Sequence, residues 1–311
     1  MRLVFAGTPA AAIPTLRALA RSHEIVAVVT RPDAPLGRKR VLTPSPVAQA
    51  AAELGLPTIK AARLDDEATG RIAALRPELG VIVAYGGLVR EPLLSTPDHG
   101  WVNLHFSLLP AWRGAAPVQR ALIAGDPELG ASVFRLVAAL DAGDVFASRV
   151  VPIPADATAD TALEILAQDG AALTADVVAG IADGTAVAVA QEGEVSLAPK
   201  LTIDDGVLDW TLPVESVYAR FRGVTPEPGA HTTVAGLRVK ILDARPAAGA
   251  EPPAAGEITA TKQSLLIGTA TTPLEVRRVQ PAGKAAMSAT DWWRGFRGAA
   301  LNGDDTIRAG A

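Results

Sequence analysis

Cysteine is absent from the 311-residue sequence, and its absence excludes several kinds of site at once. Disulfides, zinc sites built from thiolates and cysteine nucleophiles all require that side chain. Long hydrophobic runs are missing as well: the longest near-apolar run, residues 79–89, is too short to cross a bilayer and contains Tyr85 and glycines. The N-terminal residues also lack the apolar region and cleavage site of a signal peptide. We therefore expect a cytoplasmic protein with no membrane partner.

Several common catalytic motifs are missing too. Gly7 stands alone before Thr8 and Pro9, so the GxGxxG signature of a dinucleotide site does not follow the first strand-like run. Sequences of the P-loop, GxSxG and HExxH types do not occur either. The four histidines, His23, His99, His105 and His231, are too scattered to form a metal-binding motif, so no metal is expected.

Strand and helix patterns alternate through the first two-thirds of the sequence. Near-continuous apolar runs predict strands over residues 2–6, 24–30, 79–84, 101–106, 131–137 and 145–153. Apolar residues at helical spacing predict helices over residues 13–20, 47–54 and 161–182. This alternation indicates an α/β fold, with a Rossmann-like parallel sheet covered on both faces.

The pattern changes near Pro199. Short strand-like pieces rich in Gly and Pro follow at 232–235, 237–244, 256–258, 265–268 and 274–279, with helices predicted over 214–221 and 290–297. Such spacing is typical of a small, mostly-β and OB-like domain. We therefore expect a Rossmann-like domain over residues 1–199, a linker over 200–206 and a β-barrel-like C-terminal domain over 207–311.

The segment from Asn103 to Pro117, NLHFSLLPAWRGAAP, carries the most chemistry. Asn103 and His105 are two residues apart on a predicted strand, so both side chains point to one face. Ligands bind at the carboxyl ends of strands in open parallel sheets, which favours a functional site here. The plain alternative is a histidine bonded to a backbone carbonyl and an asparagine that holds a turn.

The segment LDAGD, Leu140 to Asp144, lies between two strand-like runs and is rich in turn residues. On its own pattern it is a surface turn.

The basic run Arg38, Lys39 and Arg40 lies in a polar, Pro-rich stretch, and on charge alone it is a solvated loop.

Taken together, these segments resemble the folate-dependent formyltransferase superfamily, and within it the methionyl-tRNA formyltransferase family. Asp141 follows His105 at the family's distance, and the remaining matches are FAGTP at 5–9, RPDAPLGRKRVLTPSPV at 31–47, AYGGLV at 84–89, KLTIDDGVLDW at 200–210 and RGVTPEPGAHT at 222–232. The chain departs from the family at Ala11, where an aromatic is usual, and at Ala139, where a glycine is usual. Loss of the aromatic would alter how a methionyl side chain is held.

The resemblance implies the residues of each site. The catalytic residues would be Asn103, His105 and Asp141, with the charged imidazole of His105 favoured by Asp141. The residues implied for folate binding are Ala84, Tyr85, Gly86, Gly87, Leu88, Ser107, Leu108, Leu109, Pro110, Ala138, Ala139, Leu140 and Asp144. Those implied for tRNA binding are Arg38, Lys39, Arg40, Lys200, Arg220 and Arg222.

The reaction implied by the resemblance moves a formyl group from 10-formyltetrahydrofolate, as co-substrate, to the amino group of methionyl-initiator tRNA, without a metal.

Rival interpretations share the catalytic residues: a formyltransferase acting on an amino sugar or purine precursor, or a formyltetrahydrofolate hydrolase. A non-catalytic tRNA-binding relative and a sugar-nucleotide enzyme are further alternatives. The formal net charge is −4, but residues 1–199 carry a net charge of −5 and residues 200–311 a net charge of +1, and the basic stretch at 38–40 favours a tRNA partner. No feature of the sequence asks for a subunit interface, so a monomer is expected.

Overall fold

The computed structural model describes residues 1–37, 39–251, 253–300 and 308–310. The chain forms two compact units. The first comprises residues 1–117, 128–153 and 163–199; the second comprises residues 118–127, 154–162 and 200–311. Two short stretches from the N-terminal part of the sequence thus belong to the second unit.

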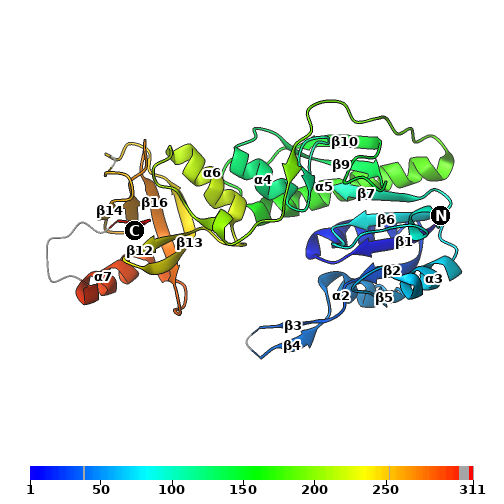
Figure 1. The fold of residues 1–311 in the computed structure, drawn as a ribbon, viewed down its shortest axis with the longest axis horizontal. Coiled ribbons are helices and arrows are strands. Elements are labelled where there is room, and N and C mark those ends of the chain that lie inside the picture. Colours follow the sequence, from blue (N-terminus) through cyan, green and yellow to red (C-terminus); the bar gives the residue numbers. More distant parts are fainter. Residues whose placement is uncertain (38, 252, 301–307, 311) are drawn as a thin grey trace. The chain divides into compact units, whose positions relative to one another are not determined.

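A seven-stranded sheet forms the centre of the first unit, in the order β10-β9-β7-β6-β1-β2-β5 (Figure 1). The strands are β1 (Arg2–Gly7), β2 (Glu24–Thr30), β5 (Thr58–Lys60), β6 (Leu79–Val83), β7 (Trp101–His105), β9 (Leu129–Arg135) and β10 (Val145–Val151). Five neighbouring strands of this sheet are parallel, as predicted: β5, β2, β1, β6 and β7. By contrast, β9 pairs antiparallel with β7, and β10 pairs antiparallel with β9. A short connection reverses the chain between β9 and β10, and such a connection allows only antiparallel pairing. The interior strands are almost fully buried, as the apolar runs require.

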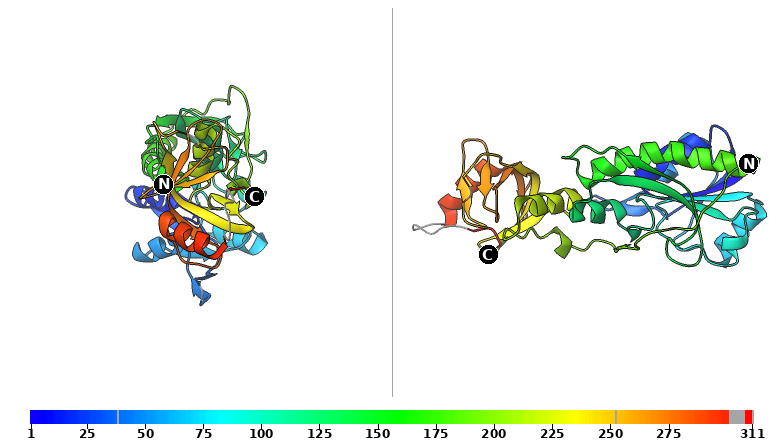
Figure 2. Two further views of the ribbon diagram at one scale, coloured as in Figure 1. Left: turned by 90° about the vertical axis from the view of Figure 1, so that its left-hand side faces the viewer. Right: turned by 90° about the horizontal axis from the view of Figure 1, so that it is seen from above.

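Helices cover both faces of this sheet: α1 (Ile13–Leu19), α2 (Pro46–Glu53), α3 (Asp66–Ala74) and α5 (Ala159–Asp183). Two of them begin at a side-chain cap, since Ser45 accepts from Ala48 N–H and Asp65 accepts from Ala68 N–H. By length and composition α5 is apolar enough to cross a membrane. In this fold it is a core helix that lies along the sheet (Figure 2), and its Gly170 is packed against Leu104 of β7.

The stretch after β2 forms a hairpin of β3 (Ala34–Leu36) and β4 (Val41–Thr43), which projects from the first unit (Figure 1). Its apolar side chains are unusually exposed, at 67% for Leu36, 59% for Val41 and 68% for Leu42. A second two-stranded pair, β8 (Arg113–Gly114) and β11 (Leu197–Ala198), joins the loop after β7 to the segment after α5.

The second unit is mostly β, as predicted. Its six-stranded sheet contains β12 (His231–Val234), β13 (Leu237–Pro246), β14 (Ile258–Ala260), β15 (Leu265–Ile267), β16 (Leu274–Pro281) and β17 (Met287–Ser288). The helices are α4 (Pro117–Ala124), α6 (Val214–Val224) and α7 (Ala289–Ala300). Its core includes Trp210, Phe221 and Trp292, and the indole N–H of Trp210 donates to Thr232 Oγ1 at 3.0 Å.

Candidate active site

A cavity of about 510 Å³ lies at the carboxyl ends of β6 and β7, where an open α/β sheet places its ligands. Asn103, His105 and Asp141, predicted as the catalytic residues, all line it. Asn103 and His105 come from the last part of β7, and Asp141 comes from the loop between β9 and β10. The alternation of side chains along β7 therefore delivers both of its polar residues to one face.

Most residues predicted to bind folate also line this cavity. They are Ala84, Tyr85, Gly86, Gly87, Leu88, Ala138, Ala139 and Leu140. The exposed side chains of Leu88 (67%) and Leu140 (58%) give the cavity an apolar rim on two sides. An apolar rim around a few polar groups suits a flat ring system that hydrogen-bonds at its edge.

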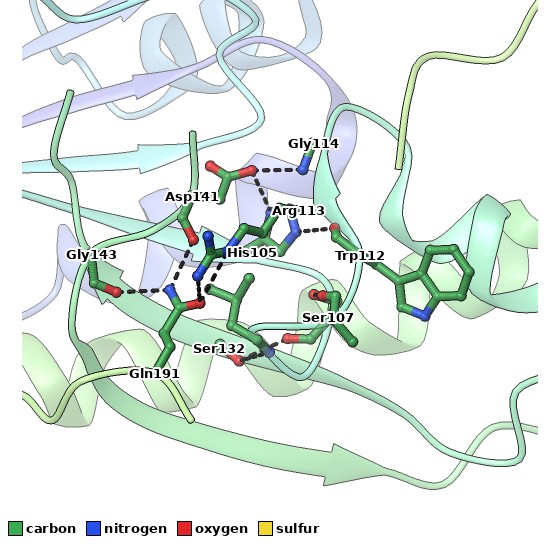
Figure 3. A network of polar contacts seen from close by, with 11 residues as sticks. His105, Ser107, Trp112, Arg113, Gly114, Ser132, Asp141, Gly143 and Gln191 are labelled. Atoms are coloured by element: carbon green, nitrogen blue, oxygen red, sulfur yellow. Dashed lines mark hydrogen bonds and ion pairs between the residues drawn. The ribbon is translucent and has the colours of Figure 1, made fainter. Parts of the chain in front are cut away.

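Five residues of the predicted folate set lie outside the cavity lining: Ser107, Leu108, Leu109, Pro110 and Asp144. Ser107 is buried and donates to Ala111 O, while Leu109 N–H donates to Ser132 Oγ (Figure 3). The position of residues 107–110 beside β9 explains the difference, because they hold the loop that carries Trp112 and Gly114.

His105 is buried, at 6% exposed, and both of its ring nitrogens face a defined group (Figure 3). Nε2 lies 2.8 Å from Trp112 O, so it carries a proton and donates to that carbonyl. Nδ1 lies 3.9 Å from Asp141 Oδ2, beyond hydrogen-bond distance. Burial lowers the pKa of His105, and this effect outweighs the opposite effects of Asp141 and the Trp112 carbonyl. The charged imidazole expected from the sequence is therefore corrected to a neutral one with an open Nδ1, because desolvation is stronger than the carboxylate.

Asp141 is held at its carboxylate by the backbone. Gly114 N–H donates to Asp141 Oδ2 at 2.8 Å, and Asp141 itself has a left-handed backbone with φ 44°. A non-glycine residue in that region is uncommon and persists only where neighbouring contacts fix it. The carboxylate is thereby fixed in direction toward His105.

Two glycines make this arrangement possible. A Cβ on Gly143 would lie 1.8 Å from Arg135 O, and a Cβ on Gly114, where φ is 128°, would lie 2.7 Å from Ala198 O. Both obstructions are backbone atoms, which cannot rotate away. Only glycine lets the β9–β10 connection turn so closely against the end of β9, and lets the loop after β7 pair so closely with β11.

Asn103 is partly buried at the cavity, and its side-chain amide makes no hydrogen bond within the described part of the chain. Its two donors are therefore available to a ligand. Across the same described residues, no group of three or more His, Asp or Glu side chains lies close enough to hold a metal ion.

Comparison with known proteins identifies the family of the chain. The formyl transferase family matches residues 1–178, and the formyl transferase C-terminal domain matches residues 200–297. The methionyl-tRNA formyltransferase of Leifsonia xyli is 62% identical over 97% of this chain and 99% of its own length. That of Clavibacter sepedonicus is 60% identical over 95% of this chain and 97% of its own length. The chain belongs to the methionyl-tRNA formyltransferase family.

Solved structures show the same fold at low sequence identity. The methionyl-tRNA formyltransferase from Clostridium thermocellum superposes with a TM-score of 0.57 at 15% identity, over 80% of this chain and 95% of that one. An N-formyltransferase from Helicobacter canadensis, solved with folinic acid and dTDP-3-aminofucose, superposes with a TM-score of 0.69 at 15% identity, over 88% and 98%. The fold of the methionyl-tRNA formyltransferase family is thus shared with an enzyme whose solved complex holds an amino sugar.

The residues predicted to bind tRNA lie in two settings. Lys39 and Arg40 are exposed at the tip of the β3–β4 hairpin, and Arg38 lies outside the described residues. Lys200 is exposed. Arg220 and Arg222 are half-buried: Arg220 donates to Asp205 O at 3.1 Å, and Arg222 lies over the Tyr218 ring at 5.4 Å. Burial lowers the pKa of Arg222, against the opposite effect of Tyr218, and both arginines have contacts inside the protein.

Three further residues shape the site and were not predicted: Trp112, Gly114 and Gln191. Trp112 and Gly114 act through backbone atoms, which leave no mark in side-chain chemistry. Gln191 donates to the backbone of Asp141, fifty residues earlier in the chain. No pattern in a single sequence joins residues so far apart.

Proposed function

We propose that this enzyme transfers the formyl group of 10-formyltetrahydrofolate to the α-amino group of methionyl-initiator tRNA, and so supports the initiation of translation. The observation that carries the proposal is the convergence of Asn103, His105 and Asp141 on one cavity at the carboxyl ends of β6 and β7. Membership of the methionyl-tRNA formyltransferase family supports the choice of substrates.

The folate occupies the apolar part of the cavity in this proposal, against residues 84–88 and 138–140. Gly86 and Gly87 line the cavity without side chains, so a pterin ring can approach their backbone. The formyl carbon then lies beside Asn103 and His105, on the floor of the cavity.

The reaction begins when the amine nitrogen of the aminoacyl group attacks the formyl carbon. A carbon–nitrogen bond forms, and negative charge develops on the formyl oxygen. The free amide donors of Asn103 stabilise that oxygen in the tetrahedral intermediate. The bond between the carbon and the folate nitrogen then breaks, and the new formamide leaves.

One proton must move from the attacking amine to the departing folate nitrogen. The neutral His105 presents an open Nδ1, and the carboxylate of Asp141 lies 3.9 Å away. An amine nitrogen can donate to either of two acceptors at that separation. We infer that this pair takes the proton from the amine and that the proton passes from there to the folate nitrogen.

The choice of acceptor rests on features outside the cavity. The catalytic residues serve an amino sugar, a purine precursor or water equally well. The exposed hairpin with Lys39 and Arg40 favours tRNA over these acceptors, because a basic loop that projects from the first unit is suited to phosphates. We assign Arg38, Lys200, Arg220 and Arg222 to the same partner, and the last two also make contacts inside the protein.

We also propose a division of the chain into a catalytic domain over 1–199, a linker over 200–206 and a tRNA-binding domain over 207–311. The family matches to 1–178 and 200–297 support a boundary near residue 200. We propose that the protein acts in the cytoplasm as a monomer, where aminoacylated tRNA and folate are both available.

A formyl-transfer assay tests the function. Purified enzyme is given 10-formyltetrahydrofolate with methionyl-initiator tRNA, methionyl-elongator tRNA or no acceptor. Rapid formylation of the initiator alone is the expected result. Release of formate without formylated tRNA would instead identify a hydrolase, and transfer only to an amino sugar would identify the rival acceptor.

A further inference from the structure

The segment after α5, residues 185–198, runs beside the catalytic loops. Val189 and Val145 exchange two backbone hydrogen bonds, at 2.8 and 2.9 Å, at the start of β10. Further along, Ser196 Oγ accepts from Trp112 N–H and Ser196 O accepts from Arg113 N–H, both at 2.9 Å. This segment therefore contacts both the loop that accepts the His105 hydrogen bond and the loop that carries Asp141.

Gln191 lies at the centre of this segment, and its side chain makes four polar contacts (Figure 3). Its Nε2 donates to Asp141 O and to Gly143 O, each at 2.8 Å. Its Oε1 accepts from Arg113, at 2.7 Å from one terminal nitrogen and 3.2 Å from Nε. All the hydrogen-bonding capacity of the amide nitrogen is used on the two carbonyls that flank Ala142.

We propose that Gln191 is a positioning residue that holds Asp141 in the conformation needed for catalysis, an inference that rests on the proposed function of Asp141. Its two donors fix the carbonyls on either side of the turn at 141–143, where Asp141 has its left-handed backbone. With that turn fixed, the carboxylate stays at Gly114 N–H and at its distance from His105.

The contacts of Arg113 add a second constraint. The guanidinium holds Oε1 of Gln191, so the amide has one orientation, with its nitrogen toward the carbonyls. A glutamate in this place would still accept from Arg113 but would have no donor for either carbonyl. A methionine would fill the same space and make neither set of contacts.

These two substitutions separate positioning from mere packing. We expect Gln191→Glu and Gln191→Met each to lower kcat about 10²-fold, the loss typical of a catalytic group displaced by about 1 Å. The KM for the folate should change less than about threefold, because Gln191 does not line the cavity. The matched control is Gln49→Glu, since Gln49 of helix α2 also donates to a carbonyl, Pro44 O at 3.0 Å, and lies outside the cavity lining and the catalytic loops. It should leave kcat unchanged.

An NMR titration of histidine side chains gives a readout independent of turnover. Asp141 raises the pKa of His105 against the effect of burial, so a displaced Asp141 should let that pKa fall further in Gln191→Met, which adds no charge beside the ring. Normal kcat in both folded variants, or an unchanged His105 titration, would overturn the inference. If only Gln191→Met were impaired, the contact with Arg113 would be the important one and the inference would be wrong. A failure of the proposed function is seen separately, as a wild-type enzyme that transfers no formyl group while the titration still responds to Gln191→Met.

Discussion

His105 has opposite environments at its two ring nitrogens. The Trp112 carbonyl fixes the proton on Nε2, while Nδ1 is left open toward Asp141. Burial disfavours the charged ring by lowering the pKa of His105. The neutral tautomer with its proton on Nε2 leaves Nδ1 able to accept a proton, as a general base does. The residue therefore enters the reaction neutral, and becomes charged only when the amine has attacked the formyl carbon.

The first prediction concerns this titration. The His105 ring should titrate below its ordinary value of 6.5 in the wild type, because desolvation lowers its pKa. In Asp141→Asn it should titrate lower still, because the carboxylate that raises the pKa is gone. Histidine side-chain NMR over a pH range from about 4.5 to about 8 covers the ordinary histidine value on both sides and measures both proteins. A His105 resonance that titrates above its ordinary value would contradict the neutral-base mechanism.

Asn103 allows a second prediction. Asn103→Ala removes the amide donors from the developing oxyanion, and we expect kcat to fall about 10²–10³-fold. The folate should bind with nearly its wild-type affinity, since the stabilised charge exists only in the transition state. Single-turnover kinetics, with tetrahydrofolate binding measured in parallel, separates these effects. An equal loss in folate affinity would assign Asn103 to ground-state binding instead.

At the scale of elements, apolar patterns predicted the central strands well. The run at 24–30 became β2 with the same bounds, and the predicted helix at 161–182 lies within α5. Short or half-exposed elements were not predicted. The strand β5 and the helix α3 were missed because they carry few apolar residues. The pair β8 and β11 joins residues more than eighty positions apart, so no local pattern could indicate it.

The turn between β9 and β10 gives a third prediction. Gly143→Ala should destabilise the protein by about 1–3 kcal/mol, the usual cost of overpacking, because its Cβ meets the carbonyl of Arg135. It should also reduce kcat, since Asp141 lies on the same turn. Gly70→Ala is the matched control: nothing lies within 4 Å of its Cβ in helix α3, so a gain of about 0.5–1 kcal/mol is expected. Urea unfolding measures both, and equal stability in the two variants would refute the argument.

The hairpin of β3 and β4 gives a fourth prediction. The double variant Lys39→Ala and Arg40→Ala should raise the KM for tRNA. The slope of log tRNA affinity against log salt concentration should also become less steep, by about 0.7–0.9 for each phosphate that the hairpin no longer neutralises. Folate binding should not change. Arg21→Ala with Arg71→Ala removes the same charge from exposed positions outside the hairpin and serves as the control. An identical salt dependence in both double variants would remove the hairpin from the tRNA site.

At the scale of the whole molecule, the sequence predicted two kinds of fold and about half of the residues that line one cavity. It did not predict how the backbone closes around that cavity. Ser107 to Pro110 match the family pattern but lie outside the cavity, where Ser107 hydrogen-bonds the loop that carries Trp112. Trp112 and Gly114 contribute a backbone carbonyl and a backbone N–H to the site. The charge on His105 also depends on burial, which only a folded chain defines.

The stability of the molecule should fall in mild acid, which is the fifth prediction. The pKa values of His105 and His23 are lowered in the folded protein, so the unfolded chain binds their protons more tightly. The free energy of unfolding should therefore decrease as the pH falls through about 6.5. The pKa values of Asp205 and Glu275 are also lowered. Their contribution to the free energy of unfolding is lost only at lower pH, as the pH falls below their ordinary values of 3.8 and 4.5. Urea unfolding about one pH unit above and one below the ordinary histidine value should show this loss in the wild type and a smaller loss in His105→Asn. The same loss in both proteins would show that His105 contributes nothing to the acid sensitivity.

The segment after α5 also sets an order of events during synthesis. Asp141 leaves the ribosome fifty residues ahead of Gln191. At about 5–20 residues per second, that interval lasts roughly 2.5–10 seconds. Throughout it, the nascent chain carries every catalytic side chain but not the backbone pairing that arranges them. A fragment cut at residue 178, where the first family match ends, would be arrested at that same stage.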